Sequence, residues 1–441
     1  MNLKSLAKHI LKRTPHPINS SILRVYELYY ARKMFGRLAD NQLSIAKTIN
    51  SKKWNATTDR DVLASGQKTK ILFYHVSGLS SGGTEKFLQI IAKHLDKSKF
   101  EVFFMYSPKP RSSSGGIRLD SRKEYLIEDT TLIEFDYEKI EQQYPYFVVD
   151  QHPNIHDVIQ KHNIDLICTA GSGYTEYPIN TITGIPIVLI NIFGSPTVQP
   201  NIKKHLSISH AVDALIGPYV PQSKREVIYI QSEDPFMTYS SPQIEQMRKS
   251  LRDKFTIPES AYVFGRIGRA DDNIFDPIGI NAFEQVVKKN PSAHYLIMSA
   301  PPILEKIVKE RNIPNVHFIP PSGLESDVWS FHFAIDALAH FRLDGESFGL
   351  NIAESMIAGN PIITHKSHIW NAHLEYLNPS FSFVAEKDDV SAYAQAMEKL
   401  IRQASEHEMG TKVMQDKARE QAEKLFLISG SIRKIEGILT K

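Results

Sequence analysis

After the first 70 residues, short apolar runs alternate with segments in which apolar residues recur at helical spacing. The runs at 71–76 (ILFYHV) and 100–106 (FEVFFMY) are typical of buried strands, and segment 84–95 between them has the period of an amphipathic helix. This order predicts a βαβ unit with parallel strands. Two further apolar runs, at 165–170 and 186–194, predict more buried strands of the same sheet.

A second series of apolar runs predicts a second parallel sheet. Its expected strands are 261–267, 293–300, 316–320, 333–340, 361–364 and 380–386. Two such series indicate two doubly wound, Rossmann-like α/β domains, for which we expect the bounds 70–240 and 241–425. Charged helices over 388–426 would close the second domain, and 426–441 would form a tail. Ligands of such sheets bind outside the carboxyl ends of the strands, so a cleft between the two domains is the expected site.

Residues 1–69 differ from the rest of the chain in charge. Up to Lys70 there are 14 basic and 4 acidic residues. The apolar residues of segments 3–13 and 21–38 recur at helical spacing. We therefore expect a basic helical extension followed by a polar linker. Two interpretations stay open: residues 1–40 lie on an anionic membrane surface, or the helices pack on the main body with a solvated basic face.

Composition and cysteine usage indicate the compartment. The 441 residues are 42% hydrophobic and 23% charged with a net charge of +3, which is ordinary for a globular protein and gives no reason to expect a nucleic-acid partner. The one cysteine, Cys168, lies in an apolar run, so we expect it in the core of a protein from a reducing compartment. No apolar run approaches the about 20 residues that span a bilayer, and no signal-peptide pattern is present. We expect a cytoplasmic protein, peripheral on the inner face of the cell membrane if the extension binds lipid.

The segment 344–364, DGESFGLNIAESMIAGNPIIT, carries the strongest chemical pattern. A loop with Glu346 follows the expected strand 333–340, and the helix after the loop carries Glu354. Both carboxylates can accept hydrogen bonds from ligand hydroxyls, one on each side of the helix start. A diphosphate flanked by two sugars fits this layout.

The start of that helix is an expected anion site. Its first backbone amides have no intrahelical acceptors and lie at the positive end of the helix dipole. A glycine in this turn lets the backbone approach a ligand closely. The ligand-binding groups expected here belong to Ser347, Phe348, Gly349 and Leu350.

The two glutamates have two other interpretations. On a continuous helix, eight residues separate Glu346 from Glu354 by about 12 Å, which exceeds the roughly 5 to 9.5 Å between the carboxyl groups of glycoside hydrolases. This disfavours a hydrolytic acid–base pair. Alternatively, both glutamates only decorate a helix start, where acidic residues are favoured.

Here the chain resembles the retaining, nucleotide-sugar-dependent glycosyltransferases of the GT-B fold, family 4 (glycosyl transferases group 1), over roughly residues 70–425. The most specific match is the E-x7-E motif formed by Glu346 and Glu354 around FGL. Gly82 and Gly83 match the glycine-rich loop of the first domain, and Arg269 in GRIGR matches an arginine that contacts the donor diphosphate. The resemblance implies that Glu354 holds the ribose and Glu346 the transferred sugar. It also implies that backbone near Phe318 and Ile319 meets the base.

The chain departs from the family pattern at two positions. Ile274 stands where the family usually has a lysine, and Asn191 where it has a catalytic histidine. An asparagine can donate and accept hydrogen bonds but does not shuttle a proton. Arg342 or Lys366 is a candidate to replace the missing cation. We therefore keep, as an alternative, a weak or inactive GT-B subunit that acts as a binding partner, or a GT-B epimerase or phosphorylase.

The resemblance also implies a reaction. A sugar moves from a nucleoside diphosphate to a hydroxyl of a saccharide or lipid-linked saccharide with retained configuration, as in bacterial surface polysaccharide biosynthesis. The catalytic groups would be Glu346, Arg269 and Asn191. No cofactor or metal is expected, because the D-x-D pattern of metal-dependent transferases occurs only at 59–61, in the polar linker.

Overall fold

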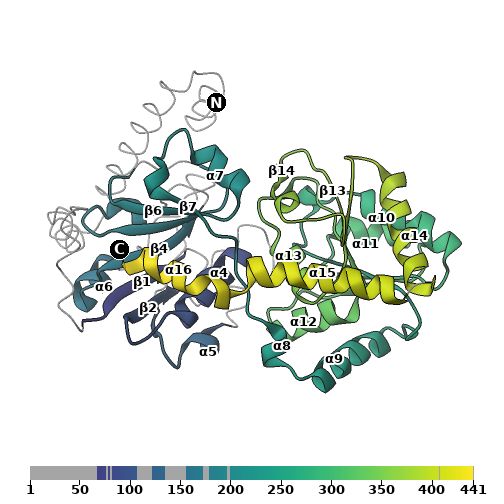
Figure 1. The fold of residues 1–441 in the computed structure, drawn as a ribbon, viewed down its shortest axis with the longest axis horizontal. Coiled ribbons are helices and arrows are strands. Elements are labelled where there is room, and N and C mark those ends of the chain that lie inside the picture. The colour runs from purple at the N-terminus through teal and green to yellow at the C-terminus, as the bar shows by residue number, and fades with distance from the viewer. Residues whose placement is uncertain are drawn as a thin grey trace.

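The computed structural model describes residues 67–75, 78–79, 82–106, 122–134, 155–171, 178–195, 199–406 and 408–440. The predicted basic extension and its membrane-binding interpretation lie outside these residues. The described part forms two lobes, each built around one parallel sheet (Figure 1). The predicted architecture of two doubly wound α/β domains is confirmed.

The first domain contains a seven-stranded sheet in the order β3-β2-β1-β4-β5-β6-β7, and all of its paired strands are parallel. Four of its strands were predicted, whereas three were missed because they are short or carry lysine and histidine. Its elements are β1 Thr69–Tyr74, α4 Gly83–His94, β2 Phe100–Tyr106, α5 Lys123–Leu126, β3 Thr131–Glu134, α6 Ile155–His162, β4 Leu166–Gly171, η1 Ile179–Thr181, β5 Ile187–Asn191, β6 Ile202–Ser207, α7 His210–Ile216, η2 Gln222–Lys224 and β7 Arg225–Val227.

The second domain contains a six-stranded parallel sheet in the order β10-β9-β8-β11-β13-β15, with a separate two-stranded pair β12-β14. Its elements are α8 Pro235–Thr238, α9 Ser241–Lys254, β8 Val263–Ile267, η3 Asp272–Ile274, α10 Ile278–Lys289, β9 His294–Met298, α11 Pro302–Arg311, β10 Val316–Ile319, α12 Glu325–Ala334, β11 Ala337–Ala339, β12 Gly345–Glu346, α13 Leu350–Ile357, β13 Ile362–His365, β14 Trp370–Asn371, η4 Ala372–Glu375, β15 Ser382–Ala385, α14 Val390–Glu406 and α15 Glu408–Phe426.

The strand predicted over 333–340 is wrong in its first half. Helix α12 continues to Ala334, and only Ala337–Ala339 forms a strand. The end of α12 is apolar on several sides, with Trp329, Phe331 and Phe333 all buried. A helix segment buried all round has no alternation of polar and apolar residues, so its sequence cannot be told from a buried strand.

The tail predicted over 426–441 is also wrong. Residues Ile428–Thr440 form helix α16, which buries Ile435 and Leu439 and contacts α4 of the first domain. Figure 1 shows α15 lying along the second lobe and α16 on the first. The chain therefore crosses between the lobes twice, and the crossings are joined by backbone hydrogen bonds of Ser232 to Phe426 (2.7 Å) and Ile428 (3.0 Å).

The core holds Cys168, as expected. Its side chain is fully buried on β4, and burial raises the pKa of the thiol far above its usual value. In the described part of the chain, no helix has the length and apolar character needed to cross a membrane.

Candidate functional site

One helix from each domain begins at the place where the two sheets face each other. Helix α4 starts after Gly82 and helix α13 after Gly349, and neither start has a side-chain cap. A Cβ built on Gly83 would lie 3.3 Å from the Leu350 side chain, so the two helix starts are in contact. Two sets of amides without intrahelical acceptors, each at the positive end of a helix dipole, therefore lie together.

Glycine is required at the start of α13 by its backbone. Gly349 has φ +93°, in the left-handed region that favours glycine. The hydroxyl of Tyr376 donates to the carbonyl of Phe348 and fixes this turn from below. The Phe348 ring packs against Tyr376 and Phe426, and the Ser347 side chain is buried, so neither side chain is exposed at this turn.

Glu346 is positioned by a second glycine in the left-handed region. Gly345 has φ +68°, and a Cβ there would lie 1.8 Å from the carbonyl oxygen of Trp370. The close approach allows β12 to pair with β14, with Glu346 opposite Asn371. The Glu346 side chain is thereby held at the carboxyl edge of the second sheet, as predicted from its place after β11.

The Glu346 carboxylate is ionised. Its Oε2 lies 3.5 Å from Arg342 Nη1, and its Oε1 lies 3.3 Å from His340 Nε2. Burial opposes ionisation, but Arg342 and His340 outweigh it and lower the pKa of Glu346 to about 2. Burial lowers the pKa of His340, and the neighbouring Glu346 carboxylate opposes this effect. Arg342 and His340 thus hold the Glu346 carboxylate in place, and its oxygens can still accept a hydrogen bond from a ligand hydroxyl.

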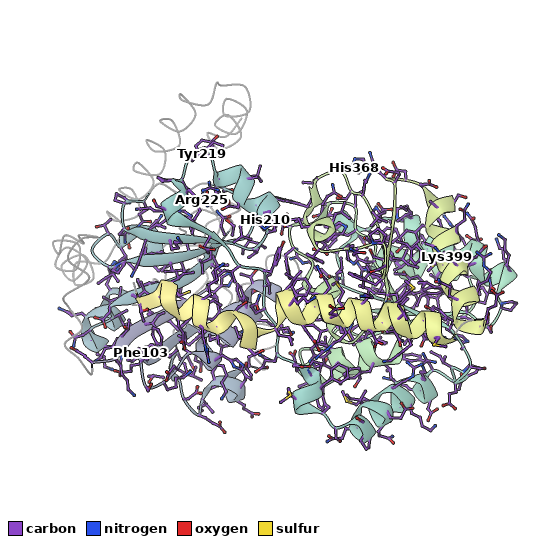
Figure 2. The ribbon with its side chains drawn as sticks, viewed as in Figure 1. Phe103, His210, Tyr219, Arg225, His368 and Lys399 are labelled. Carbon is purple, nitrogen blue, oxygen red and sulfur yellow. The ribbon has the colours of Figure 1, made fainter. Side chains whose placement is uncertain are left out.

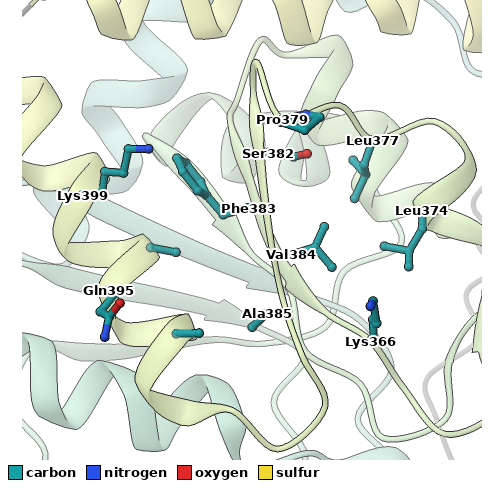
Figure 3. A pocket seen from close by; sticks show the side chains of 12 residues that line it. Lys366, Leu374, Leu377, Pro379, Ser382, Phe383, Val384, Ala385, Gln395 and Lys399 are labelled. Atoms are coloured by element: carbon teal, nitrogen blue, oxygen red, sulfur yellow. The ribbon is translucent and has the colours of Figure 1, made fainter.

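Neither predicted replacement for the missing lysine is free. Arg342 binds Asp344 with two nitrogens, at 2.6 and 3.0 Å. Lys366 pairs with Glu386 at 2.5 Å and lines a hollow of about 630 Å³ beside the edge strand β15 (Figure 3). The structure thus gives both cations other partners.

Glu354 is buried in α13 and its partner comes from the other domain. Lys86 of α4 donates to Glu354 Oε1 at 2.7 Å, and His332 Nε2 lies 3.7 Å from Oε2. Burial opposes ionisation, but Lys86 and His332 outweigh it and lower the pKa of Glu354. The pKa of Lys86 is raised, because Glu325 and Glu354 outweigh the effect of burial. The carboxylate expected to hold a ribose is therefore bound by a lysine of the other domain.

The Lys86–Glu354 pair belongs to a polar network between the domains that the sequence did not reveal. Lys86 also donates to Glu325 of α12 at 3.1 Å. Arg122 donates to the same Glu325 at 3.1 Å and to Gln89 at 2.9 Å. The sequence offers only a lysine one turn after a glycine pair, on an amphipathic helix, and such helices commonly carry lysines.

Arg269 lies in the loop that follows β8, at the carboxyl edge of the second sheet. Its side chain is exposed and forms no ion pair with any other described residue. Ile274, in the lysine position, is buried, and its carbonyl accepts a 3.0 Å hydrogen bond from Leu343. Phe318 and Ile319 end the edge strand β10, and their contact with a base stays a prediction.

Asn191 ends β5 and is fully buried. Its Oδ1 accepts from the amide of Gly194 at 2.8 Å, and its Nδ2 donates to the carbonyl of Ser195 at 3.1 Å. Both ends of the amide therefore hold the turn after β5. The catalytic role predicted for Asn191 stays a prediction, and the structure adds a role in shaping this loop.

A further contact joins the domains beside this loop. Glu375 of the second domain accepts from the amides of His210 (2.9 Å) and Ala211 (2.6 Å) at the start of α7. Figure 2 labels His210 at the end of α7 that faces the second lobe. The carboxylate also accepts from Tyr229 at 3.2 Å. An acid at a helix start in the other domain stabilises the apposition of the two lobes.

Comparison with known proteins agrees with this architecture. Residues 247–424 match the family model described as glycosyl transferases group 1. A glycosyltransferase of Rickettsia africae has the same fold, with 17% identity over 84% of this chain and 98% of that chain and a TM-score of 0.64. Alr3699/HepE of Anabaena, in complex with UDP-glucose, has 20% identity over 84% and 99% and a TM-score of 0.62.

WaaG, a glycosyltransferase involved in lipopolysaccharide biosynthesis, has 13% identity over 85% of this chain and 99% of that chain, with a TM-score of 0.59. No curated protein matches the sequence. The fold is therefore that of the GT-B glycosyltransferases. More narrowly, the match to the glycosyl transferases group 1 model lies within the second domain.

Proposed function

We propose that this protein is a retaining glycosyltransferase that moves a sugar from a nucleoside diphosphate sugar to a hydroxyl of a saccharide or lipid-linked saccharide. The observation that carries the proposal is the meeting of two uncapped, glycine-started helices, α4 and α13, at the cleft. Such a pair of helix starts suits a diphosphate. The group 1 match of the second domain and the UDP-glucose held by HepE support the same class of donor.

The residues of the cleft have distinct roles in this reaction. The amides of Gly349 and Leu350 and the side chain of Arg269 bind the diphosphate and stabilise the charge that develops on it. Glu346 accepts hydrogen bonds from hydroxyls of the transferred sugar, and Glu354 binds the ribose. Phe318 and Ile319 flank the base with their backbone.

Bond changes in the proposed reaction balance without a protein nucleophile. The bond from the anomeric carbon to the diphosphate oxygen breaks, and a bond to the acceptor oxygen forms on the same face. The acceptor proton passes to the departing diphosphate, because the amide of Asn191 cannot take it. Arginine and helix amides supply the positive charge, so the proposal requires no metal.

The proposed acceptor is a saccharide presented at a membrane. The 14 basic and 4 acidic residues up to Lys70 support attraction to anionic lipid. WaaG, with the same fold, acts in lipopolysaccharide biosynthesis. We therefore propose a cytoplasmic, peripheral protein of surface polysaccharide assembly. Vesicle co-sedimentation of the full chain and of a chain lacking residues 1–40 tests this part.

A panel of UDP, GDP and ADP, each beside its parent nucleoside, tests the donor class by thermal shift. A ligand that binds only the folded state raises the melting temperature. We expect one diphosphate to stabilise the protein more than its nucleoside does, and NMR of the product from the matching sugar donor to show retained configuration. The donor assignment fails if no diphosphate exceeds its nucleoside.

One alternative has an observation in its favour. With Ile274 in the lysine position, Asn191 in the histidine position and Glu354 bound by Lys86, the chain fits a nucleotide-binding subunit of low activity. Saturable diphosphate binding without sugar transfer to any of several saccharide acceptors would favour that function.

A further inference from the structure

Arg266 is a large cation inside the second domain, next to the proposed donor site. It lies on β8, and only 1% of the residue is exposed. Burial lowers the pKa of Arg266 to about 10, so the guanidinium keeps its charge near pH 7. A fully buried charge normally has an opposite charge and a complete set of hydrogen bonds.

Within the part of the chain that the structure describes, Arg266 has neither a direct ion pair nor a complete set of hydrogen bonds, and the nearby Glu346 carboxylate, which favours its charge, does not contact it. Its one hydrogen bond, from Nη1 to the carbonyl of Ser299, measures 3.4 Å, longer than the usual 2.7 to 3.2 Å or so. Its Nε is buried without any hydrogen-bond partner. The guanidinium lies over the Phe341 ring, 5.1 Å from the ring centroid, and forms no ion pair with a described carboxylate.

Another buried arginine of the same domain shows the contrast. Arg252 is 3% exposed, and its Nη2 donates to Asp336 at 2.8 Å. Its Nε donates to the carbonyl of Ala334 at 2.9 Å, and its Nη1 to that of Ala261 at 3.2 Å. Arg252 is a fully satisfied structural cation, whereas Arg266 is not.

The position of Arg266 identifies the missing anion. A Cβ on Gly268 would lie 3.1 Å from Arg266 Nη2, so the guanidinium touches the backbone of the loop that continues into Arg269. No side chain at Gly268 separates the buried charge from the space above this loop. Charges interact strongly across a short path of low dielectric. An anion bound on the loop would therefore feel the Arg266 charge.

We propose that Arg266 is a buried electrostatic residue of the donor site, whose counter-charge is the diphosphate bound above the 268–269 loop. This inference rests on the proposed function. In this role Arg266 supplies, from beneath the site, the positive charge that is absent at Ile274. The other two candidate cations, Arg342 and Lys366, are paired with Asp344 and Glu386. In the ligand-free protein the unpaired charge destabilises the fold, and bound diphosphate removes that cost.

Substitution of Arg266 by Met tests this, because removal of an uncompensated charge has effects of opposite sign on stability and on binding. Without ligand, R266M should melt at the wild-type temperature or a few degrees higher. Its affinity for the nucleoside diphosphate selected by the thermal-shift panel should fall about tenfold or more, while its affinity for the parent nucleoside stays unchanged. R266K keeps the charge and should retain most of the diphosphate affinity.

R252M is the matched control. It breaks a buried ion pair, so it should lower the melting temperature markedly. The ratio of its affinities for the diphosphate and for the parent nucleoside should stay at the wild-type value. If R266M behaves like R252M, or fails to fold, Arg266 is a structural residue and the inference is overturned. Equal diphosphate affinity in R266M and wild type overturns it as well. A wild-type protein that binds no diphosphate overturns the proposed function instead, which separates the two failures.

Discussion

The ion pair between Lys86 and Glu354 makes a prediction that the sequence alone would not make. As a ligand-binding carboxylate only, Glu354 could be replaced by Gln with little change in the stability of the unliganded protein. The structure places it 2.7 Å from Lys86, with side chains only 5% and 8% exposed. We therefore expect both Glu354→Gln and Lys86→Met to destabilise the unliganded protein.

The magnitude follows from what each substitution leaves behind. Breaking a buried pair by removing one partner costs about 3 to 5 kcal/mol, because a buried charge remains without compensation. In Lys86→Met, Glu325 keeps Arg122 at 3.1 Å, whereas Glu354 keeps only His332 at 3.7 Å. Most of the loss therefore comes from Glu354. The double variant leaves neither charge and should lose clearly less than the sum of the two single variants.

Urea unfolding of the wild type, both single variants and the double variant measures the coupling as a double-mutant cycle. We expect a coupling of about 2 kcal/mol or more. Lys366→Met is the control: its pair with Glu386 is exposed, with side chains 48% and 69% accessible, so its loss should stay within about 0.5 kcal/mol. Additive losses in the cycle would refute the pairing of Lys86 with Glu354.

Other predictions follow from single features. Gly345→Ala should lower the free energy of unfolding by about 2 kcal/mol or more, since the position combines φ +68° with a backbone oxygen 1.8 Å from the new Cβ. Gly437→Ala, in open space on α16, is the control and should be neutral or stabilising in the same chemical denaturation. The pKa of Glu346 falls from 4.5 to about 2 on folding, so its contribution of about 3 kcal/mol is present above pH 4.5 and lost as the pH falls toward 2. Glu346→Gln should therefore flatten the acid limb of a plot of unfolding free energy against pH, and an unchanged limb would contradict the assignment. Glu375→Ala should lower stability by about 1 kcal/mol through the lost helix cap between domains, and an unshifted urea midpoint would argue against that contact. Glu354→Gln should weaken nucleoside diphosphate binding by about 1 to 3 kcal/mol in calorimetry if the carboxylate binds ribose.

Much of the fold could be predicted because parallel sheets leave a clear pattern. Strands buried on both faces read as continuous apolar runs, and β1, β2, β4 and β5 follow that rule. The sixth strand, IKKHLS, could not be recognised, because its lysines interrupt the run while their aliphatic stems still pack. The final helix was missed for another reason: its charged residues hide the buried face that docks on α4.

The candidate site was predictable where backbone chemistry decides it and unpredictable where tertiary contacts do. A glycine before a helix at the carboxyl end of a strand suffices to predict that Gly349 starts α13 at the cleft edge, and the anion site there stays a prediction. The partners of Glu354 were not predictable, since Lys86 lies 268 residues away in the chain. Arg342 shows the same limit: its charge suggested a free cation, but Asp344, two residues on, binds it with both oxygens.

Some of the atoms that join the domains are also proposed to bind the donor. Association of the domains and binding of the donor are therefore linked. Glu354 Oε1 accepts from Lys86 in the ligand-free protein. A ribose hydroxyl bound to Glu354 must share or displace that ammonium. Whatever free energy the Lys86 contact loses when the donor binds, the contact takes the same free energy from donor binding, because coupling free energies are reciprocal. Two chain crossings bonded to each other at Ser232, and the contact of Glu375 with the start of α7, join the lobes independently of Lys86. On the proposed role of Glu354, the Lys86 ammonium and the ribose hydroxyl therefore compete for the same carboxylate oxygen.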